Sequence, residues 1–276
     1  MKVFVMRGMK PTIVVAAAML PPIMGSSPAL AQSTSDDRLT AMVSGSTLTD
    51  TDGGWAGSLG WLHNFNANTV FGIAGDYQQL GDARWKFGSL TLAHGFGSAD
   101  RRSNLYFEGH EGSGDDLTHS YDYSIYAGGL IQNITRQLAI QLEDKQIDVD
   151  TVKGNLPKIG VQYLWSPSLL TTLNYSHSVH GNLGTRIGSL RIDHFGKRVN
   201  LLGGIAGGET SPIVINRPIT GEEDTVPQNL RQVFIGATWP FPRADIGLLA
   251  DYQELERSER FTLSLTATLR LRGARK

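Results

Sequence analysis

The sequence predicts an all-β chain in which about fourteen antiparallel strands close into a transmembrane barrel. Three observations predict this fold: a leader like a secretory signal peptide, strand-length runs of alternating polarity, and connections that alternate between short and long. After the leader, no window holds about 18 consecutive apolar residues, which excludes a helical membrane protein.

Residues 1–31 predict a signal peptide. Three basic residues precede an apolar run over 12–20, two prolines interrupt that run, and "ALAQS" at 29–33 supplies a cleavage site after Ala31. The apolar run is far shorter than the roughly 20 residues that a spanning helix needs. Residues 32–276 are then expected to form a single barrel domain, with the barrel itself over 35–272.

Composition and charge exclude further classes of protein. The 276 residues are 40% hydrophobic and 18% charged, which is typical of an ordered chain. Loss of the leader removes three basic residues and no acidic ones, leaving a formal charge of −4, so we expect no nucleic-acid partner. The chain has 32 glycines and no cysteine, so no disulfide is available. A soluble periplasmic or secreted β protein and an outer-membrane barrel both remain open.

Fourteen segments alternate with period two. Their length of about 10 residues suits a tilted strand that crosses a bilayer, whereas strands of soluble sheets average about 5 to 6. In the last of them, "RFTLSLTATLRLRG", every second residue from Phe261 to Leu271 is apolar. The expected strands are 38–48, 54–63, 68–78, 84–95, 103–111, 119–130, 136–144, 157–165, 169–178, 185–194, 198–207, 230–239, 244–254 and 259–271.

The connections sort by parity. Those after even-numbered segments are tight, at 64–68, 97–101, 133–136, 166–168, 196–198 and 240–243. Those after most odd-numbered segments are longer and more acidic, at 112–117, 144–155 and 208–229. Outer-membrane barrels have short periplasmic turns at one rim and longer external loops at the other, whereas a soluble sandwich has no reason to sort its loops. The pattern favours an outer-membrane location, with 208–229 as a long external loop.

Aromatic residues lie beside the short turns and predict a girdle at the headgroup level of the membrane. The predicted girdle consists of Trp61, Phe65, Phe71, Phe96, Trp165, Phe195, Trp239 and Phe241.

The two faces of the segments differ in character. One face is apolar, with Ile159, Val161, Leu201 and Leu248 among its members, and is assigned to lipid. The other carries many charges, and burying them in a dry sandwich would cost several kcal/mol per unpaired ion, so this face needs water or mutual pairing. The side chains either line a path through a polar lumen or only stabilise the inner wall. The candidates for lining the lumen are Glu108, Asp122, Glu143, Arg191, Asp193, Asp251, Arg260 and Arg270.

No segment supplies a recognisable catalytic, metal or cofactor motif. In "NYSHSVHGN" at 174–182, His177 and Ser178 are adjacent and therefore point to opposite faces of a strand, while His180 is followed two residues along by Asn182. The acidic loops lack the ligand spacing of an EF-hand. We therefore expect no enzyme, metal or cofactor, although a His, Ser and acid from distant segments would escape this test.

The chain resembles the YaiO-type outer-membrane β-barrel proteins, which are similar in architecture to the barrel portions of exopolysaccharide-export porins. The resemblance covers most of 35–272 and rests on the strand rhythm of 123–147, 158–178 and 260–271. It implies passage of a polysaccharide or other polar solute, with outer-membrane lipid, lipopolysaccharide and the barrel assembly machinery as partners. Two features depart from it: we expect no helical repeat domain before the barrel, and "GARK" follows the last expected strand where a terminal aromatic residue is typical.

The sequence therefore predicts an outer-membrane barrel whose polar lumen is a channel or export pore. An outer-membrane lipid hydrolase and a plugged barrel that docks a partner are the alternatives.

Overall fold

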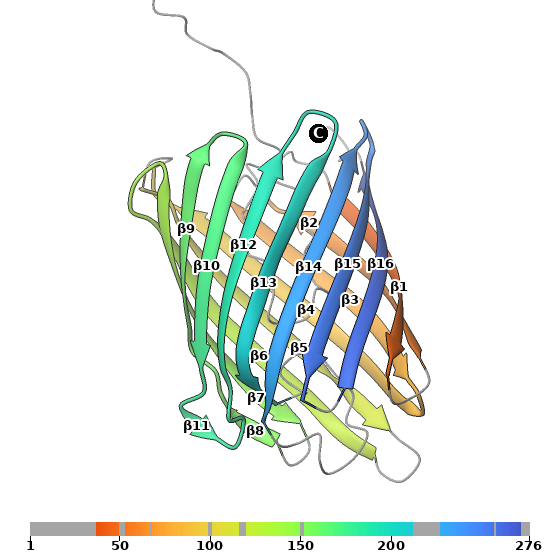
Figure 1. The fold of residues 1–276 in the computed structure, drawn as a ribbon. Coiled ribbons are helices and arrows are strands. Elements are labelled where there is room, and N and C mark those ends of the chain that lie inside the picture. Colours follow the sequence, from red (N-terminus) through yellow and green to blue (C-terminus); the bar gives the residue numbers. More distant parts are fainter. Residues whose placement is uncertain are drawn as a thin grey trace, which may run out of the picture.

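The chain folds into one closed antiparallel barrel in a computed structural model (Figure 1). In the described part of the chain, no helix is long and apolar enough to cross a membrane. The residues that the structure describes are 37–49, 53–66, 68–98, 101–115, 120–149, 152–211, 227–256 and 258–271, so the expected signal peptide, its cleavage site after Ala31 and the terminal "GARK" lie outside them.

Sixteen strands of the described residues form one sheet, and fourteen of them make up the wall. The ring closes where β1 pairs with β16 and where β7 pairs with β9. The strands are β1 (Asp37–Leu48), β2 (Gly54–Asn64), β3 (Thr69–Leu80), β4 (Ala83–Phe96), β5 (Ser103–Asp115), β6 (Ser120–Asn133), β7 (Leu138–Val149), β8 (Val152–Asn155), β9 (Lys158–Ser166), β10 (Leu169–His177), β11 (His180–Gly181), β12 (Arg186–Phe195), β13 (Asn200–Thr210), β14 (Gln228–Pro240), β15 (Ala244–Leu255) and β16 (Ser258–Leu271).

Two of the expected loops are strand instead. Residues 144–155 extend β7 to Val149 and return as β8, and β5 continues to Asp115 through most of the expected loop 112–117. These segments were predicted as loops because their sequences are polar. A strand that extends beyond the membrane needs no apolar face, but its backbone groups still form hydrogen bonds with the neighbouring strand. The loop expected at 208–229 is also shortened by strand at both ends, and its part over 212–226 lies outside the described residues.

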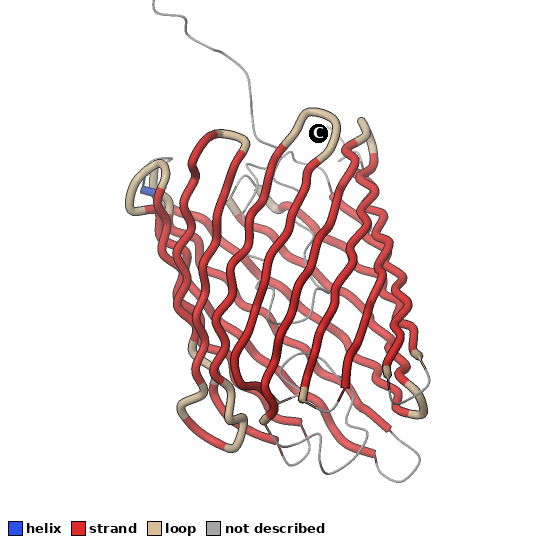
Figure 2. The backbone as a smooth tube through the Cα atoms, in the orientation of Figure 1, coloured by secondary structure: helices blue, strands red, loops and turns tan. Residues whose placement is uncertain are grey.

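Connections of similar length lie at the same end of the barrel. The turns after β2, β4, β6, β9, β12 and β14 gather at one end of the barrel, here named the short-turn rim, and the opposite end is named the long-loop rim (Figures 1 and 2). The start of β1 and the end of β16 also lie at the short-turn rim, where Asp37 pairs with Leu271. The expected strand count and closed antiparallel topology are confirmed.

The outward face is apolar along the middle of the wall. On the final strand Leu263, Leu265 and Leu269 are about half exposed and alternate with buried Ser264 and Thr268. This arrangement is what a lipid-facing wall requires, because the apolar side chains that a soluble protein would bury point outward here.

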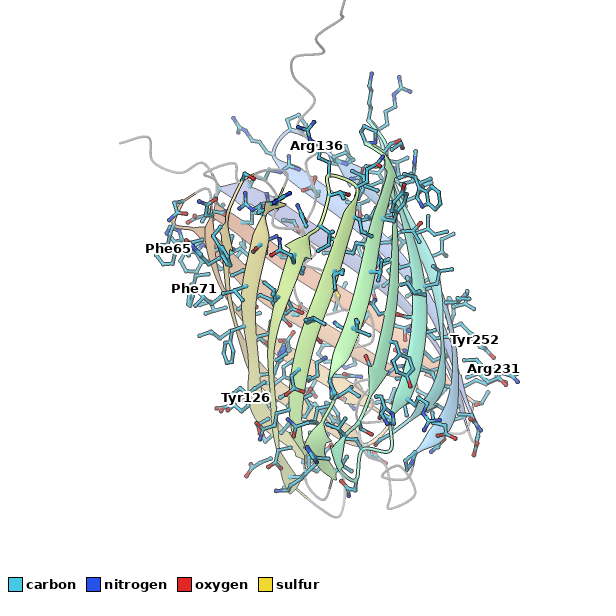
Figure 3. All side chains as sticks on the ribbon, turned by 90° about the vertical axis from the view of Figure 1, so that its left-hand side faces the viewer. Phe65, Phe71, Tyr126, Arg136, Arg231 and Tyr252 are labelled. Carbon is cyan, nitrogen blue, oxygen red and sulfur yellow. The ribbon has the colours of Figure 1, made fainter. Side chains whose placement is uncertain are left out.

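Aromatic side chains form a belt near each rim. Figure 3 shows Phe65 and Phe71 on the outside toward the short-turn rim marked by Arg136, and Tyr126 and Tyr252 on the outside toward the other end. Of the eight aromatic residues expected in the first belt, five are large exposed side chains: Phe65, Phe96, Trp165, Trp239 and Phe241. Two such belts mark the interfaces of a membrane barrel.

The alternation reverses in polarity at the long-loop end of β6. Tyr121 and Tyr123 are buried inside the barrel, and Asp122 between them is exposed on the outer face opposite Ser113 of β5. The expectation that Asp122 lines the lumen is therefore wrong. The rule that polar residues face inward applies only at the depth of lipid, and this part of β6 carries its polar residues outside.

Candidate functional site: the inner wall of the barrel

Charged side chains cross the inner wall of β3–β9 between two apolar clusters. The apolar cluster toward the short-turn rim consists of Ala93, Tyr106, Ile131 and Ala139. The other apolar cluster, here named the mouth cluster, lies toward the long-loop rim. The inward charged and titratable residues between them are named the charged belt, and they are Asp76, Glu108, His110, Glu143, Lys145 and Lys158.

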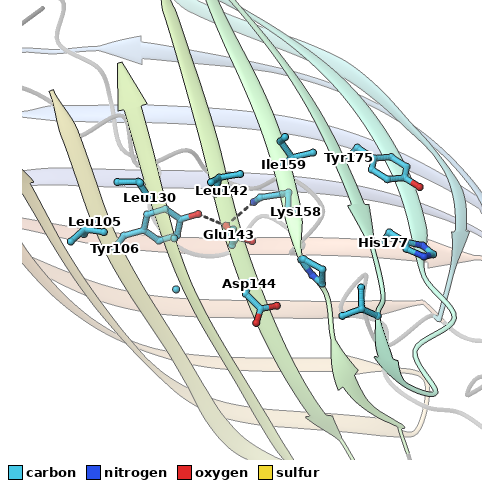
Figure 4. A pocket seen from close by; sticks show the side chains of 14 residues that line it. Leu105, Tyr106, Leu130, Leu142, Glu143, Asp144, Lys158, Ile159, Tyr175 and His177 are labelled. Atoms are coloured by element: carbon cyan, nitrogen blue, oxygen red, sulfur yellow. Dashed lines mark hydrogen bonds and ion pairs between the residues drawn. The ribbon is translucent and has the colours of Figure 1, made fainter. Parts of the chain in front are cut away.

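Glu143 is the centre of the charged belt. Lys158 Nζ lies 2.7 Å from Glu143 Oε2, and both side chains are less than a tenth exposed. Tyr106 donates its hydroxyl hydrogen to the same carboxylate and accepts a hydrogen bond of 2.9 Å from Gln141 Nε2. Figure 4 shows the contacts of Glu143 with Tyr106 and Lys158, which come from β7, β5 and β9. Lys145 also acts electrostatically on Glu143, so two ammonium groups stabilise this carboxylate.

Glycine makes room for Tyr106. A Cβ on Gly129 of β6 would lie 2.3 Å from the Tyr106 ring, so the ring lies directly against the backbone of the neighbouring strand. The pair of glycines at 128–129 thus serves the two faces differently: Gly129 accommodates Tyr106 inside, while a Cβ on Gly128 would meet nothing within 4 Å outside.

A second polar cluster lies across the lumen on β14–β16. Asp251 accepts hydrogen bonds from Gln232 Nε2 at 2.7 Å and from Gln253 Nε2 at 2.9 Å. The carboxylate fixes the orientation of both amides because it only accepts hydrogen bonds. Among the described residues neither amide oxygen has a hydrogen-bond partner, and both are buried, so this cluster keeps two unsatisfied acceptors inside the wall. Arg260 pairs in register with Gln253 and is also buried.

Two ion pairs lie closer to the short-turn rim. Arg191 binds Asp193 along β12 through Nε and Nη2, at 2.6 to 3.0 Å. Arg270 binds Asp245 of β15 with Nη2 2.7 Å from Oδ2. These pairs follow the inner wall, as the sequence alternation predicts for lumen side chains.

The structure thus places seven of the eight expected lumen residues on the inner face, with Asp122 the exception. It joins Glu143 to a partner that the sequence analysis did not select, Lys158, and Asp251 to the two glutamines. Lys158 was not selected because it stands at the start of its expected strand, where the alternation of polar and apolar residues does not yet show which face a side chain takes. The glutamines carry no charge and so did not stand out.

The mouth cluster makes the inner wall apolar toward the long-loop rim. Trp85 donates its indole hydrogen to the Tyr121 hydroxyl and its ring lies 5.1 Å from that of Tyr123. Leu183, in the connection between β11 and β12, is fully buried in the same cluster. The members are Trp85, Tyr121, Tyr123, Ile125, Ile147, Val149, Val152, Leu156 and Leu183. The members are at most 6% exposed because they pack against one another, so a solute that entered from the long-loop rim would pass beside this packed cluster before it reached the charged belt.

The histidines considered for a hydrolase do not face a nucleophile on their strand. His177 is exposed on the outer wall. The neighbouring Ser178 instead binds Thr185: its amide donates to the Thr185 carbonyl oxygen at 2.8 Å, and its hydroxyl oxygen accepts a hydrogen bond from the Thr185 amide. Among the described residues, no three or more acidic or histidine side chains gather as a metal site would require.

Comparison with known proteins relates this chain to others by fold alone. No family model matches the sequence, and no curated protein matches it. Among solved structures, the "CymD monoaromatic hydrocarbon channel" superposes with a TM-score of 0.64 at 8% identity, covering 91% of this chain and 92% of that one. The P. putida toluene transporter TodX gives 0.53 at 8% identity over 88% and 92%, and a Pseudomonas aeruginosa FadL homologue gives 0.54 at 9% over 86% and 90%. The fold is therefore that of outer-membrane β-barrels.

Proposed function

We propose that this protein is a passive outer-membrane channel for a small organic solute that has both an apolar part and polar groups. The observation that carries the proposal is the layering of the inner wall, in which the aromatic mouth cluster is followed by the charged belt. An aromatic lining favours the apolar part of a solute, and a charged inner wall favours its polar groups.

The barrel supports this function physically. Its backbone groups pair around the whole ring and its middle outward face is apolar, so the bilayer is the environment that suits the wall. Three proteins of similar fold are a monoaromatic hydrocarbon channel, a toluene transporter and a FadL homologue, and these neighbours support transport as the role. Passage of a polysaccharide, which the sequence resemblance implies, stays a prediction.

Conductance measurement tests the proposal. Purified protein refolded into a planar bilayer is expected to give discrete current steps, and a variant that removes the Arg191 charge, Arg191→Gln, is expected to shift the ion preference toward cations. The control is Arg231→Gln, because Arg231 is exposed on the outside of β14. Absence of current above background would overturn the channel and favour a plugged docking barrel.

Solute size is tested with liposomes that carry the protein. Swelling rates are compared for a monosaccharide, for oligosaccharides of increasing length and for small aromatic acids. Fast uptake of the aromatic acids with exclusion of the oligosaccharides is the expected result, and uptake of long oligosaccharides would instead support the polysaccharide prediction.

A further inference from the structure

Basic side chains are concentrated at the short-turn rim. Four of the six short turns carry exposed lysine or arginine, and no described residue of the six turns is acidic. The opposite end of the barrel differs, with exposed Asp115, Glu209 and Glu256 among its residues. The exposed basic residues of the short turns are Arg101, Arg136, Lys197, Arg198 and Arg243. The short-turn rim is therefore positively charged, and charge complementarity makes an anion its partner.

The carboxylates nearest to this rim do not neutralise it, because each already has a partner. Asp37 binds a histidine at 2.8 Å. Asp193 and Asp245 face the lumen and each bind an arginine of the inner wall. The exposed basic residues thus supply the net charge of the rim surface.

Three of the basic residues gather on two neighbouring turns. β13 pairs with β14 from Asn200 and Thr238 onward, so the β12–β13 turn lies beside the β14–β15 turn at the top of Figure 1. The first turn carries Lys197 and Arg198 and the second carries Arg243, and these three residues are named the basic arc. No carboxylate of the described residues forms an ion pair with the arc, so its charge is available to a ligand.

Hydrogen bonds hold both turns in place. The Gly196 amide donates to the Val199 carbonyl oxygen at 3.1 Å, and the Phe241 amide donates to the Ala244 carbonyl oxygen at 2.7 Å. The inner wall also supports the second turn, because Arg270 Nη1 donates to the Phe241 carbonyl oxygen at 2.8 Å. Fixed turns keep the three charged side chains on one arc of the rim, which lowers the entropy lost when a ligand binds.

The aromatic belt beside the arc sets its depth in the membrane. Trp239 and Phe241 are 40% and 52% exposed on the outside, directly before the second turn, and Leu201 of β13 is 46% exposed nearby. Aromatic rings of such a belt lie at the headgroup level, so the arc lies among headgroups. With the long loops outside the cell, as their lengths predict, this is the periplasmic leaflet. In an outer membrane that leaflet consists of phospholipid, and lipopolysaccharide occupies the other.

We propose that the basic arc binds the headgroup of one anionic phospholipid of the periplasmic leaflet, with an acyl chain along Leu201 and Trp239. Phosphate oxygens accept charge-assisted hydrogen bonds from arginine and lysine, and the exposed apolar side chains beside the arc suit an acyl chain. A headgroup with net negative charge gains most, because each basic residue attracts it. The inference rests on the membrane location in the proposed function, and does not require the lumen to conduct.

Native mass spectrometry of the refolded, detergent-solubilised protein tests the arc. The probes are phosphatidylglycerol and phosphatidylethanolamine with the same acyl chains, because the first is anionic and the second carries no net charge. The wild type is expected to retain one phosphatidylglycerol in preference to phosphatidylethanolamine. The preference should fall as salt is added, since the three charges are exposed.

Neutral variants of the arc measure its contribution. Arg198→Gln or Arg243→Gln alone is expected to lower retention of phosphatidylglycerol about fivefold, which is the effect of one basic residue near an anionic lipid. The arc triple variant adds Lys197→Gln to both and is expected to abolish the preference, while retention of phosphatidylethanolamine stays unchanged. The turns should remain folded, because their hydrogen bonds use backbone groups and Arg270, which are not replaced.

The matched control removes three charges from the other end of the barrel. Arg84, Lys86 and Arg231 are exposed on the outside near the long-loop rim. The control triple variant, Arg84→Gln with Lys86→Gln and Arg231→Gln, changes the net charge by the same amount. It is expected to retain phosphatidylglycerol as the wild type does, which separates a local site from an effect of net charge.

Three results would overturn the inference. A preference for phosphatidylglycerol that survives the arc triple variant would exclude the arc as the site. An equal loss in the control triple variant would attribute the preference to net charge. A dimer that only the arc triple variant disrupts would identify the acidic end of a second copy of the chain as the occupant.

Heat-modifiable migration and conductance of the wild type separate this inference from the proposed function. Loss of heat-modifiable migration would count against the membrane barrel and so against both. Conductance without a preference for phosphatidylglycerol would overturn the lipid site alone, and a preference without conductance would overturn the channel alone.

Discussion

Removal of the Lys158 charge tests whether the charged belt holds the barrel together. In Lys158→Met the Glu143 carboxylate stays buried and loses its closest cation, which lies at 2.7 Å in the wild type. Breaking a buried ion pair by removing one partner typically costs about 3–5 kcal/mol, because an uncompensated charge remains. Tyr106 and the nearby Lys145 still act on Glu143, so we expect a loss at the lower end, about 3 kcal/mol in the free energy of unfolding.

The assay is urea unfolding from phospholipid vesicles, followed by tryptophan fluorescence. The matched control is Lys153→Met, which removes an exposed partner 2.9 Å from Asp148. The side chains of that pair are 62% and 43% exposed, so solvent screens it and its loss should cost at most about 1 kcal/mol.

A double variant separates the charge from the packing. Glu143→Gln combined with Lys158→Met removes both charges and keeps a side chain that can accept the Tyr106 hydrogen bond. It should be more stable than Lys158→Met alone by about 2 kcal/mol, since both members of the buried pair lose their charge together and Lys145 keeps Glu108 as an electrostatic partner. If Lys158→Met costs as little as Lys153→Met, or if the double variant is no more stable than the single one, the belt is solvated and the argument from burial is refuted.

Three further variants test the wall and the mouth. Gly129→Ala should cost about 1–3 kcal/mol because its methyl group would overlap the Tyr106 ring, whereas Gly128→Ala should be close to neutral; urea midpoints compare the two, and equal effects would contradict the close contact. Leu183→Asn should increase single-channel conductance by hydrating the mouth cluster, and an unchanged conductance would place the constriction elsewhere. Leu263→Arg should lower stability by about 2–4 kcal/mol if that position lies near the middle of the bilayer, and a change below 1 kcal/mol would exclude a lipid-facing position there.

Most of the barrel was predictable because one physical rule applies along each strand. An apolar residue at every second position is what lipid selects, and from Phe261 to Leu271 the rule holds at every position. Loop lengths then set the direction of each strand, since short turns share a rim. The two short strands β8 and β11 were not predicted, because their sequences are polar and because their pairing depends on neighbouring strands that the sequence does not reveal.

The inner wall was only partly predictable. Alternation gives the face of Glu143 and of Asp251, but the choice of partner depends on the stagger between strands. Lys158 stands opposite Glu143 because β9 pairs with β7 in that register, and Gln232 reaches Asp251 across β14 and β15. Nothing local to either strand specifies these offsets, so the sequence could identify polar lumen residues without joining them into clusters.

The reversal on β6 marks a boundary of the bilayer. Along one strand the outward residues change from Leu130 to Tyr126 and then to Asp122, while the inward residues change from Ala127 to Tyr123. A wall in lipid needs apolar side chains outside, as at Leu130. A wall in water needs polar side chains outside and apolar side chains packed inside, as at Asp122 and Tyr123. The hydrocarbon therefore ends near Tyr126, which has the amphipathic side chain that interfaces favour. The mouth cluster then lies beyond the hydrocarbon on this side of the barrel, so its residues are buried by one another and stabilise the protruding strands as the core of a soluble sheet would. A substitution in the mouth cluster should consequently change the packing at the long-loop end of the barrel without changing insertion of the wall into the membrane.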